Sequence, residues 1–248
     1  MALPDTLTME RACLKTWPGI EVEWDGSWVR RAAGGFTKRA NSLQCFDPDD
    51  GDNAEDRLAA GVDWFTARGL PPVVRTTPLA SHRLNAVLDE AGWATIDRSY
   101  LFAMPLAEHE ADAQGQLVEP LDPRFLAAQQ ALQGYSDAKV DQMRNVLAVL
   151  AVPAMGIVVE RDGAAVASGL MAIADGIAVA TSVIADRNRR RQGLGSAMMR
   201  TGLAWAKAQG ATTAALNVQA DNAAGQALYG SLGYTHQYDY TYRVRGQA

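Results

Sequence analysis

The sequence has little cysteine and no long apolar segment. Its two cysteines, Cys13 and Cys45, are too few for a disulfide framework. Its longest apolar candidate, residues 146–152, covers about two helical turns, whereas a membrane-spanning helix needs about 20 residues. The first residues also lack a basic region followed by an apolar core, which is the pattern of a secretory signal. We therefore expect no membrane partner and a cytoplasmic location.

Metal-ligand patterns and an excess of positive charge are missing as well. His, Cys, Asp and Glu nowhere have the spacing of metal ligands, so we predict no metal. The net charge of −5 and the pI of about 5.2 argue against a nucleic-acid partner. The arginine run at residues 187–191 stays open to two interpretations, a solvated turn or a nucleic-acid patch.

Glycine and arginine gather in one short segment between a predicted strand, residues 177–184, and a predicted helix, residues 194–209. Glycines at a helix start let the backbone approach a ligand closely, and the unpaired N–H groups of the first turn attract anions. A P-loop would need Lys and then Ser or Thr after Gly195, and a dinucleotide fingerprint would need Gly or Ala at Met198, so neither fits. The candidate anion-binding residues are Arg190, Arg191, Gln192, Gly193, Leu194, Gly195 and Ser196.

A second segment, residues 222–234, places an amide and a phenol on one face of a predicted helix. Asn222 and Tyr229 are seven residues apart, close to two full turns, so their side chains project together. Gly233 is a natural helix stop. Taken alone, Asn222 also fits a helix cap and Tyr229 a half-buried packing residue.

In this order the two motifs resemble the GNAT superfamily of N-acyltransferases, over roughly residues 114–245. Arg190 to Gly195 is similar to the family's Arg-x-x-Gly-x-Gly loop, which binds the pyrophosphate of acyl-CoA. Asn222 to Tyr234 is similar to the family's Asn-x-x-Ala-x-x-x-Tyr-x-x-x-Gly-Phe/Tyr helix, with Gly225 where Ala is usual. The resemblance implies acetyl-CoA as co-substrate and an α/β (α+β) fold with a mixed central sheet flanked by helices.

The resemblance also implies roles for single residues. Acyl transfer from a thioester to an amine passes through an oxyanion and expels a thiolate. A phenol with a pKa of about 10 can reprotonate a thiolate whose thiol has a pKa of about 8.5, if it is positioned for it. By resemblance Tyr229 is this proton donor, and Asn222 contacts the pantetheine arm. Backbone N–H groups of the preceding strand, at Val183, Ile184 and Ala185, would meet the oxyanion.

The chain divides near residue 110. Residues 107–116 are polar and acidic and read as an exposed linker. After them the pattern predicts a strand, two helices, three strands, a helix, a strand, a helix and a strand, which is the family's order. Asp162-Gly163 and Asp175-Gly176 predict hairpin turns between the three strands. We therefore expect a domain at 1–110 and a catalytic domain at 111–248.

The first domain resembles a degenerate copy of the second. Residues 84–100 align with residues 225–241 without a gap, and in both segments a helix ends at Gly-aromatic and a strand follows. Residues 73–76 would be the counterpart of residues 214–217, the strand before that helix. Leu88 stands where Tyr229 stands, and no Arg-x-x-Gly-x-Gly precedes the first copy. The sequence thus predicts a tandem of two GNAT-like domains with one active site.

The predicted function is an N-acetyltransferase that moves an acetyl group from acetyl-CoA to a primary amine of a small molecule or amino acid. No Cys or Ser is placed as an acyl carrier, so direct transfer in a ternary complex is expected. The alternative is an acyl-CoA-binding sensor without turnover. A homodimer stays open as a further partner, because the sequence does not fix the oligomeric state.

Two questions stay open in the sequence. The general base has several ambiguous candidates, none marked by a motif: Asp137, Asp175, Glu119, Glu160, His82 and His236. A basic cluster in the first half fits either a solvated strand and turn or a site for an acidic or polar substrate. Its members are Arg30, Arg31, Lys38, Arg39 and Asn41.

Overall fold

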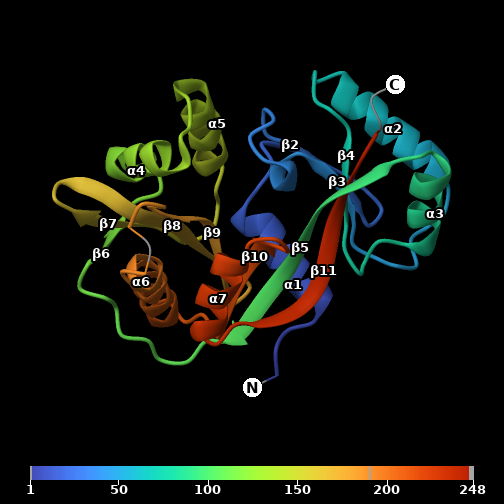
Figure 1. Cartoon of the computed structure of the whole chain (residues 1–248). Coiled ribbons are helices and arrows are strands. Elements are labelled where there is room, and N and C mark those ends of the chain that lie inside the picture. Colours follow the sequence, from blue (N-terminus) through green and yellow to red (C-terminus); the bar gives the residue numbers. More distant parts are fainter. Residues whose placement is uncertain (1, 190, 246–248) are drawn as a thin grey trace.

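The strands of the chain form one continuous sheet. A computed structural model describes residues 2–189 and 191–245, and within these residues eleven strands follow the order β1-β2-β3-β4-β11-β5-β10-β9-β8-β7-β6 (Figure 1). The strands are β1 Glu21–Asp25, β2 Trp28–Ala32, β3 Ser42–Cys45, β4 Val73–Thr76, β5 Ala94–Pro105, β6 Gly115–Val118, β7 Ala154–Arg161, β8 Ala164–Ala174, β9 Ile177–Ala185, β10 Thr213–Gln219 and β11 Thr235–Val244.

Helices cover both faces of this sheet. They are α1 Thr6–Thr16, α2 Ala54–Thr66, α3 His82–Glu90, α4 Pro123–Gln133, α5 Asp137–Ala148, α6 Leu194–Ala208 and α7 Ala223–Ser231, with a short 3-10 turn at Lys38–Ala40. Helix α4 packs on β7, β8 and β9 beside α5, and α6 packs on β6 to β9. Figure 1 shows α4 and α5 on one side of these strands and α6 on the other. The expected fold class, a mixed sheet flanked by helices, is confirmed.

The element order of the second half is the expected one. The two hairpins turn at Asp162-Gly163 and Asp175-Gly176, where both residues of each pair have positive φ, the geometry of a type I′ turn. Gly233 ends α7 with φ +97, a conformation that glycine adopts without strain. The polar segment 107–116 is less free than a linker, because Asp112 forms an ion pair with Arg200 of α6 and β6 begins at Gly115.

The middle of the sheet exchanges strands between the two halves. Strand β5 belongs to the first half of the chain, yet it lies between β10 and β11 and pairs with both in antiparallel fashion. Strand β11 belongs to the second half and lies between β5 and β4. In Figure 1 these two long strands cross the centre of the molecule side by side. Each half therefore completes the sheet of the other.

This exchange is symmetric, as a tandem repeat requires. Strands β3 and β4 pair in parallel on one side of the centre, and β9 and β10 pair in parallel on the other. Ser99 and Tyr240, equivalent in the alignment of the two copies, pair directly with each other across β5 and β11. A pseudo-twofold axis thus passes between these two residues.

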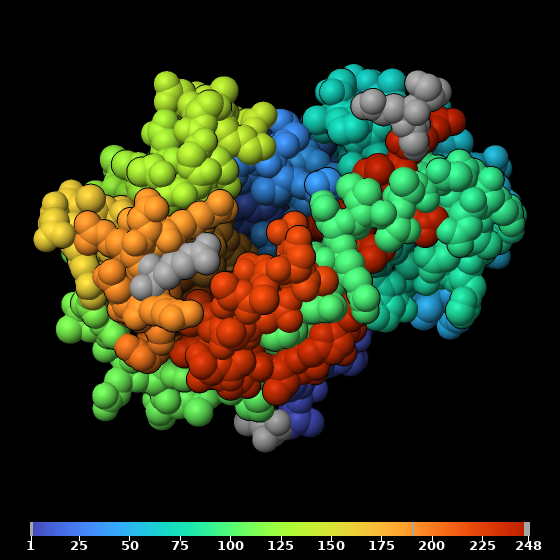
Figure 2. All heavy atoms as spheres, in the orientation of Figure 1, coloured from blue at the N-terminus to red at the C-terminus, as the bar shows by residue number. Residues whose placement is uncertain are grey.

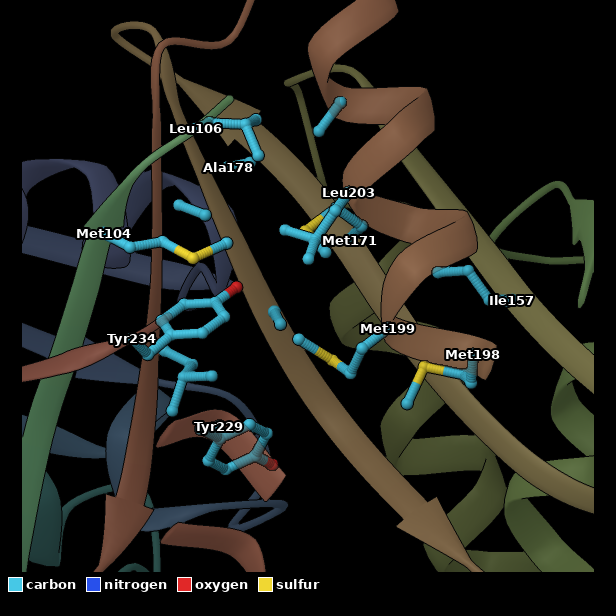
Figure 3. Close-up of a cluster of buried hydrophobic side chains, with 14 of the residues drawn as sticks. Met104, Leu106, Ile157, Met171, Ala178, Met198, Met199, Leu203, Tyr229 and Tyr234 are labelled. Carbon is cyan, nitrogen blue, oxygen red and sulfur yellow. The ribbon is translucent and has the colours of Figure 1, made fainter. Parts of the chain in front are cut away.

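The two halves also share their hydrophobic core. Phe102, Met104 and Leu106 from β5 and the residue that follows it pack in one cluster with residues of α6, β7 and β10. Figure 3 shows Met104 beside Tyr234, with Met171, Met199 and Leu203 across the cluster. The first half also has a buried cluster of its own, from Trp28 to Trp93, but the shared cluster would be exposed in part if the two halves separated.

A buried ion pair lies near the pseudo-twofold axis. Glu10 of α1 and Arg75 of β4 are each about 1% exposed and form a bidentate contact. The same carboxylate accepts hydrogen bonds from Tyr238 at 2.6 Å and from Gln44 at 2.7 Å. Arg75 also donates to the Asn217 side chain at 3.3 Å. Helix α1 and strands β3, β4 and β11 are therefore joined through one carboxylate.

Candidate functional site

The parallel strands β9 and β10 separate at the point where the sequence predicted the active site. They pair from Ile177 with Thr213 to Ala180 with Leu216, and both strands continue unpaired on that side. The gap opens into a cavity of about 200 Å³, here called the strand-gap cavity. It is lined by Arg39, Ala180, Thr181, Ser182, Val183, Asn217, Val218, Gln219, Asn222 and Tyr229. Figure 2 shows a hollow on this face between the orange and red segments.

A bulge in β9 turns the backbone at the cavity. The register between β8 and β9 shifts at this point, and Ser182 has a φ of +52. The Gln129 side chain of α4 holds the bulge, because its amide donates to the Ser182 carbonyl at 2.9 Å. After the bulge the Asp186 N–H donates to the Val166 carbonyl on β8.

The direction of the backbone N–H groups follows from that last contact. Successive N–H groups of a strand point to opposite sides. The Ile184 N–H is therefore directed at β8, as the Asp186 N–H is. Those of Val183 and Ala185 are directed at the gap, and Val183 lines the cavity.

Helix α6 begins next to this cavity. Its first intrahelical bond runs from the Ala197 N–H to the Gly193 carbonyl, so the N–H groups of Leu194, Gly195 and Ser196 have no partner inside the helix. Gly193 is the N-cap with a φ of +72, and Arg191 before it has a φ of +60. Unpaired N–H groups at a helix N-terminus attract anions.

Gly195 brings this helix start close to the second motif. A Cβ at Gly195 would lie 2.9 Å from Cδ2 of Leu228 on α7. A side chain at this position would require the Leu228 side chain to shift, so glycine favours the close approach of the first turn of α6 to α7. The two predicted motifs are thereby neighbours in space.

The side chains of the loop before α6 differ in their surroundings. Arg191 and Gln192 are exposed, and Gln192 accepts a hydrogen bond from Arg161 at 3.3 Å. Arg189 is paired with Asp162 at 3.3 Å and with Asp186 at 3.7 Å. Arg190, a predicted pyrophosphate ligand, lies outside the described residues.

Asn222 combines both interpretations that the sequence left open. Its side-chain oxygen accepts the Gly225 N–H at 2.9 Å and so caps α7. The same side chain lines the strand-gap cavity. A Cβ at Gly225 would lie 2.7 Å from the Asn222 amide nitrogen, so Ala, the usual residue of the family here, would require this side chain to shift.

Tyr229 is buried, and its environment is apolar. The side chain is 6% exposed, its ring lies 6.0 Å from the ring of Tyr234, and burial raises the pKa of Tyr229 to about 12. No group of the described residues forms a hydrogen bond with its hydroxyl, although the residue lines the cavity. Figure 3 shows the hydroxyl groups of Tyr229 and Tyr234 pointing to different sides of the cluster.

The ambiguous candidates for a general base do not line the strand-gap cavity. Asp175 pairs with Lys15, Asp137 accepts from Gln130, and His236 contacts Asp239 on the surface of β11. Sequence reasoning missed three cavity residues that close the far side of the gap, namely Asn217, Val218 and Gln219. They stand at the end of an ordinary strand, where no local signal marks them.

Comparison with known proteins identifies the family. The family described as "Probable histone acetyltransferase Rv0428c C-terminal" matches residues 5–243. The chain belongs to this family. The uncharacterized N-acetyltransferase YobR of Bacillus subtilis (strain 168) is 21% identical over 250 residues, which cover 98% of this chain and 100% of YobR.

Solved structures share the fold over the whole chain. A GCN5-related N-acetyltransferase from Kribbella flavida superposes with a TM-score of 0.70 at 21% identity and covers 100% of this chain and 98% of its own. A tandem GNAT protein from the clavulanic acid biosynthesis pathway superposes with a TM-score of 0.63 at 12% identity, covering 100% and 90%. The expected GNAT membership is confirmed, and the protein is an acyl-CoA-dependent N-acetyltransferase.

Among residues 2–189 and 191–245, no helix is long and apolar enough to cross a membrane. In the same described ranges, no group of three or more His, Cys, Asp or Glu side chains could hold a metal ion.

Proposed function

We propose that this GNAT enzyme transfers the acetyl group of acetyl-CoA directly to a primary amine of a small molecule or amino acid. The Tyr229 hydroxyl carries the proposal. It reaches a cavity between separated strands, and no described residue occupies its hydrogen-bonding capacity. Unlike the Tyr234 hydroxyl, it is not one of the fully buried side-chain oxygens of the described residues, so a ligand in the cavity can meet it.

The reaction needs a proton donor on the leaving side. A C–N bond forms, the thioester C–S bond breaks, the amine loses a proton and the thiolate gains one. Burial raises the pKa of Tyr229 to about 12, so the phenol is protonated at neutral pH. Its hydroxyl would donate a hydrogen bond to the leaving sulfur and supply the proton as the C–S bond breaks. The N–H groups of Val183 and Ala185 would donate to the oxyanion.

Acetyl-CoA, the acetyl donor, fits the anion site at the start of α6. The free N–H groups of Leu194, Gly195 and Ser196 would bind the pyrophosphate, with Arg191 and Gln192 beside them. We retain Arg190 in this proposal from its place in the motif. Asn222 uses its oxygen for the helix cap, so its amide N–H groups would be the ones that contact the pantetheine arm.

Direct transfer is favoured over an acyl-enzyme on cysteine. Cys13 and Cys45 are both buried and neither lines the cavity. Burial and the nearby Glu10 raise the pKa of Cys13 to about 11, so its nucleophilic thiolate is rare at neutral pH. A ternary complex requires neither.

We further propose that residues 111–248 carry the catalytic groups and residues 1–110 form the degenerate copy. The division describes the origin of the two parts, because their strands interleave in one sheet. The cytoplasm, where acyl-CoA is available, is the proposed location.

Thiol release tests the proposal. The protein is incubated with acetyl-CoA and, one at a time, with a panel of primary amines, and free thiol is measured. We expect release that depends on the amine. If the protein binds acetyl-CoA and releases no thiol with any amine, turnover is excluded and the alternative, an acyl-CoA-binding sensor, is favoured.

A further inference from the structure

A second cavity adjoins the strand-gap cavity at the junction of the two halves. It measures about 220 Å³ and is here called the junction cavity. Lys38, Arg39 and Asp97 of the first half line it together with Tyr240 and Tyr242 of β11. The two cavities share Arg39, Asn217, Val218 and Gln219 as lining residues. A ligand in the junction cavity would therefore reach the site of Tyr229 from the side of the first half.

The basic cluster of the first half does not behave as a solvated surface. Arg30 pairs with Glu23 and Lys38 pairs with Asp97 at 2.6 Å. Arg39 is different. It is half-buried with its guanidinium 5.5 Å from the ring centre of Trp17, and no carboxylate of the described residues lies within 4.0 Å of it.

Positive charge also lies behind the junction cavity. Arg31 is 1% exposed, donates to the Trp17 carbonyl at 3.2 Å and has no carboxylate within 4.0 Å among the described residues. Burial, and to a smaller extent the neighbouring Arg75, lower the pKa of Arg31 to about 10. Among the described residues, Arg31 and Arg39 have no carboxylate within 4.0 Å, and Arg75 is paired with Glu10. Asp97, which also lines the junction cavity, is paired with Lys38.

Arg75 contacts two residues of the cavity wall. The Arg75 guanidinium lies 4.1 Å from the ring centre of Tyr240, which lines the junction cavity. Arg75 also donates to Asn217, which lines both cavities. Arg75 has Glu10 as its counterion, whereas Arg31 is buried without one. Buried charge without a counterion is costly, and an anion bound near it would offset part of that cost.

We propose that the amine acceptor also carries a carboxylate, which Arg39 binds in the junction cavity while the amine points toward Tyr229. The inference rests on the proposed function and specifies its substrate class. A guanidinium and a carboxylate form paired, charge-assisted hydrogen bonds, so Arg39 can orient such an acceptor. A lysine-rich peptide would bring further positive charge to this wall and is disfavoured.

Matched acceptors test the charge directly. Thiol release from acetyl-CoA is measured with a set of free amino acids, with the carboxamide of each, with spermidine and with a lysine-rich peptide. We expect kcat/KM for the best amino acid to exceed that of its carboxamide roughly 10–100-fold. Arg39→Gln should reduce kcat/KM for the acid to the level of the amide while the acetyl-CoA affinity is retained, and Arg39→Lys should fall between.

Arg68→Gln is the matched control, because Arg68 also stacks on an indole, 3.7 Å from the ring centre of Trp64, but lines neither cavity. It should leave the ratio of acid to amide unchanged. Equal rates for acids and amides, or preference for spermidine or the lysine-rich peptide, would overturn the carboxylate proposal and leave the acetyltransferase standing. Failure of every amine to release thiol would instead reject the proposed function itself.

Discussion

Removal of the Glu10 carboxylate should cost a large part of the stability of this protein. Glu10→Gln leaves Arg75 charged, buried and without its counterion, and weakens the contacts with Tyr238 and Gln44. Breaking a buried pair in this way costs about 3–5 kcal/mol. For a chain of this size each kcal/mol shifts the Tm by about 2–4 °C, so the Tm should fall by roughly 6–20 °C.

Urea unfolding followed by tryptophan fluorescence measures this loss. Glu108→Gln is the control, since that side chain is 89% exposed and lies 3.8 Å from Lys207; it should cost less than about 0.5 kcal/mol. Exchanging both partners for apolar residues, Glu10→Leu with Arg75→Met, should recover part of the loss. A loss below about 1 kcal/mol for Glu10→Gln would refute the reasoning.

Three further predictions follow from the same structure. Burial raises the pKa of Glu10, but the ion pair with Arg75 and the hydrogen bonds from Arg75, Tyr238 and Gln44 together lower it more, so its folded pKa lies below the unfolded value of about 4.3. The stabilisation from this carboxylate is therefore lost as the pH falls through the folded pKa, and acid unfolding should be shallower in Glu10→Gln. Gly193→Ala and Gly134→Ala place a side chain at φ +72 and +69, with no other atom within 4 Å of the new Cβ. Calorimetry should therefore show a similar loss of stability for both, about 1 kcal/mol, whereas titration should show weaker CoA binding for Gly193→Ala alone. Residues 111–248 expressed alone lack β5 between β10 and β11 and should be insoluble, and co-expression with residues 1–110 should restore soluble protein; soluble, CoA-binding 111–248 alone would contradict the exchange.

Much of the second half could be predicted because its signals are local. Glycine turns such as Asp162-Gly163, the Gly193 loop and the Gly233 stop mark element ends directly, and the Asn222 to Tyr229 spacing marks a helix face. Each of these signals depends on a backbone conformation or a helical period within a few residues. Local chemistry of this kind is readable in a sequence.

The exchange of β5 and β11 could not be predicted in the same way. The alignment of residues 84–100 with 225–241 indicated two copies, but the alternation of a strand does not state which strand it pairs with. The pairing is decided by tertiary contacts such as those of Met104 with the core of the second half. The sequence therefore indicates the repeat but not the exchange of strands between its two copies.

The roles of Glu10 and Arg39 depend on contacts that are distant in the sequence. Glu10 looks like a surface residue of a helix, and its pairing with Arg75, 65 residues away, has no local signal. Arg39 was one of five members of a basic cluster with two equal interpretations. Only the structure separates the paired members, such as Lys38, from Arg39.

The most direct test of the catalytic claim compares two tyrosines. Tyr229 and Tyr234 are both buried, their rings are 6.0 Å apart, and neither hydroxyl has a hydrogen-bond partner among the described residues, but only Tyr229 lines the strand-gap cavity. Thiol release from acetyl-CoA with a competent amine is measured for Tyr229→Phe and Tyr234→Phe, with CoA affinity determined in parallel. Loss of a general acid predicts a fall in kcat of about 100-fold or more for Tyr229→Phe and a near-normal kcat for Tyr234→Phe, with CoA binding retained in both. An unchanged kcat in Tyr229→Phe would contradict the account.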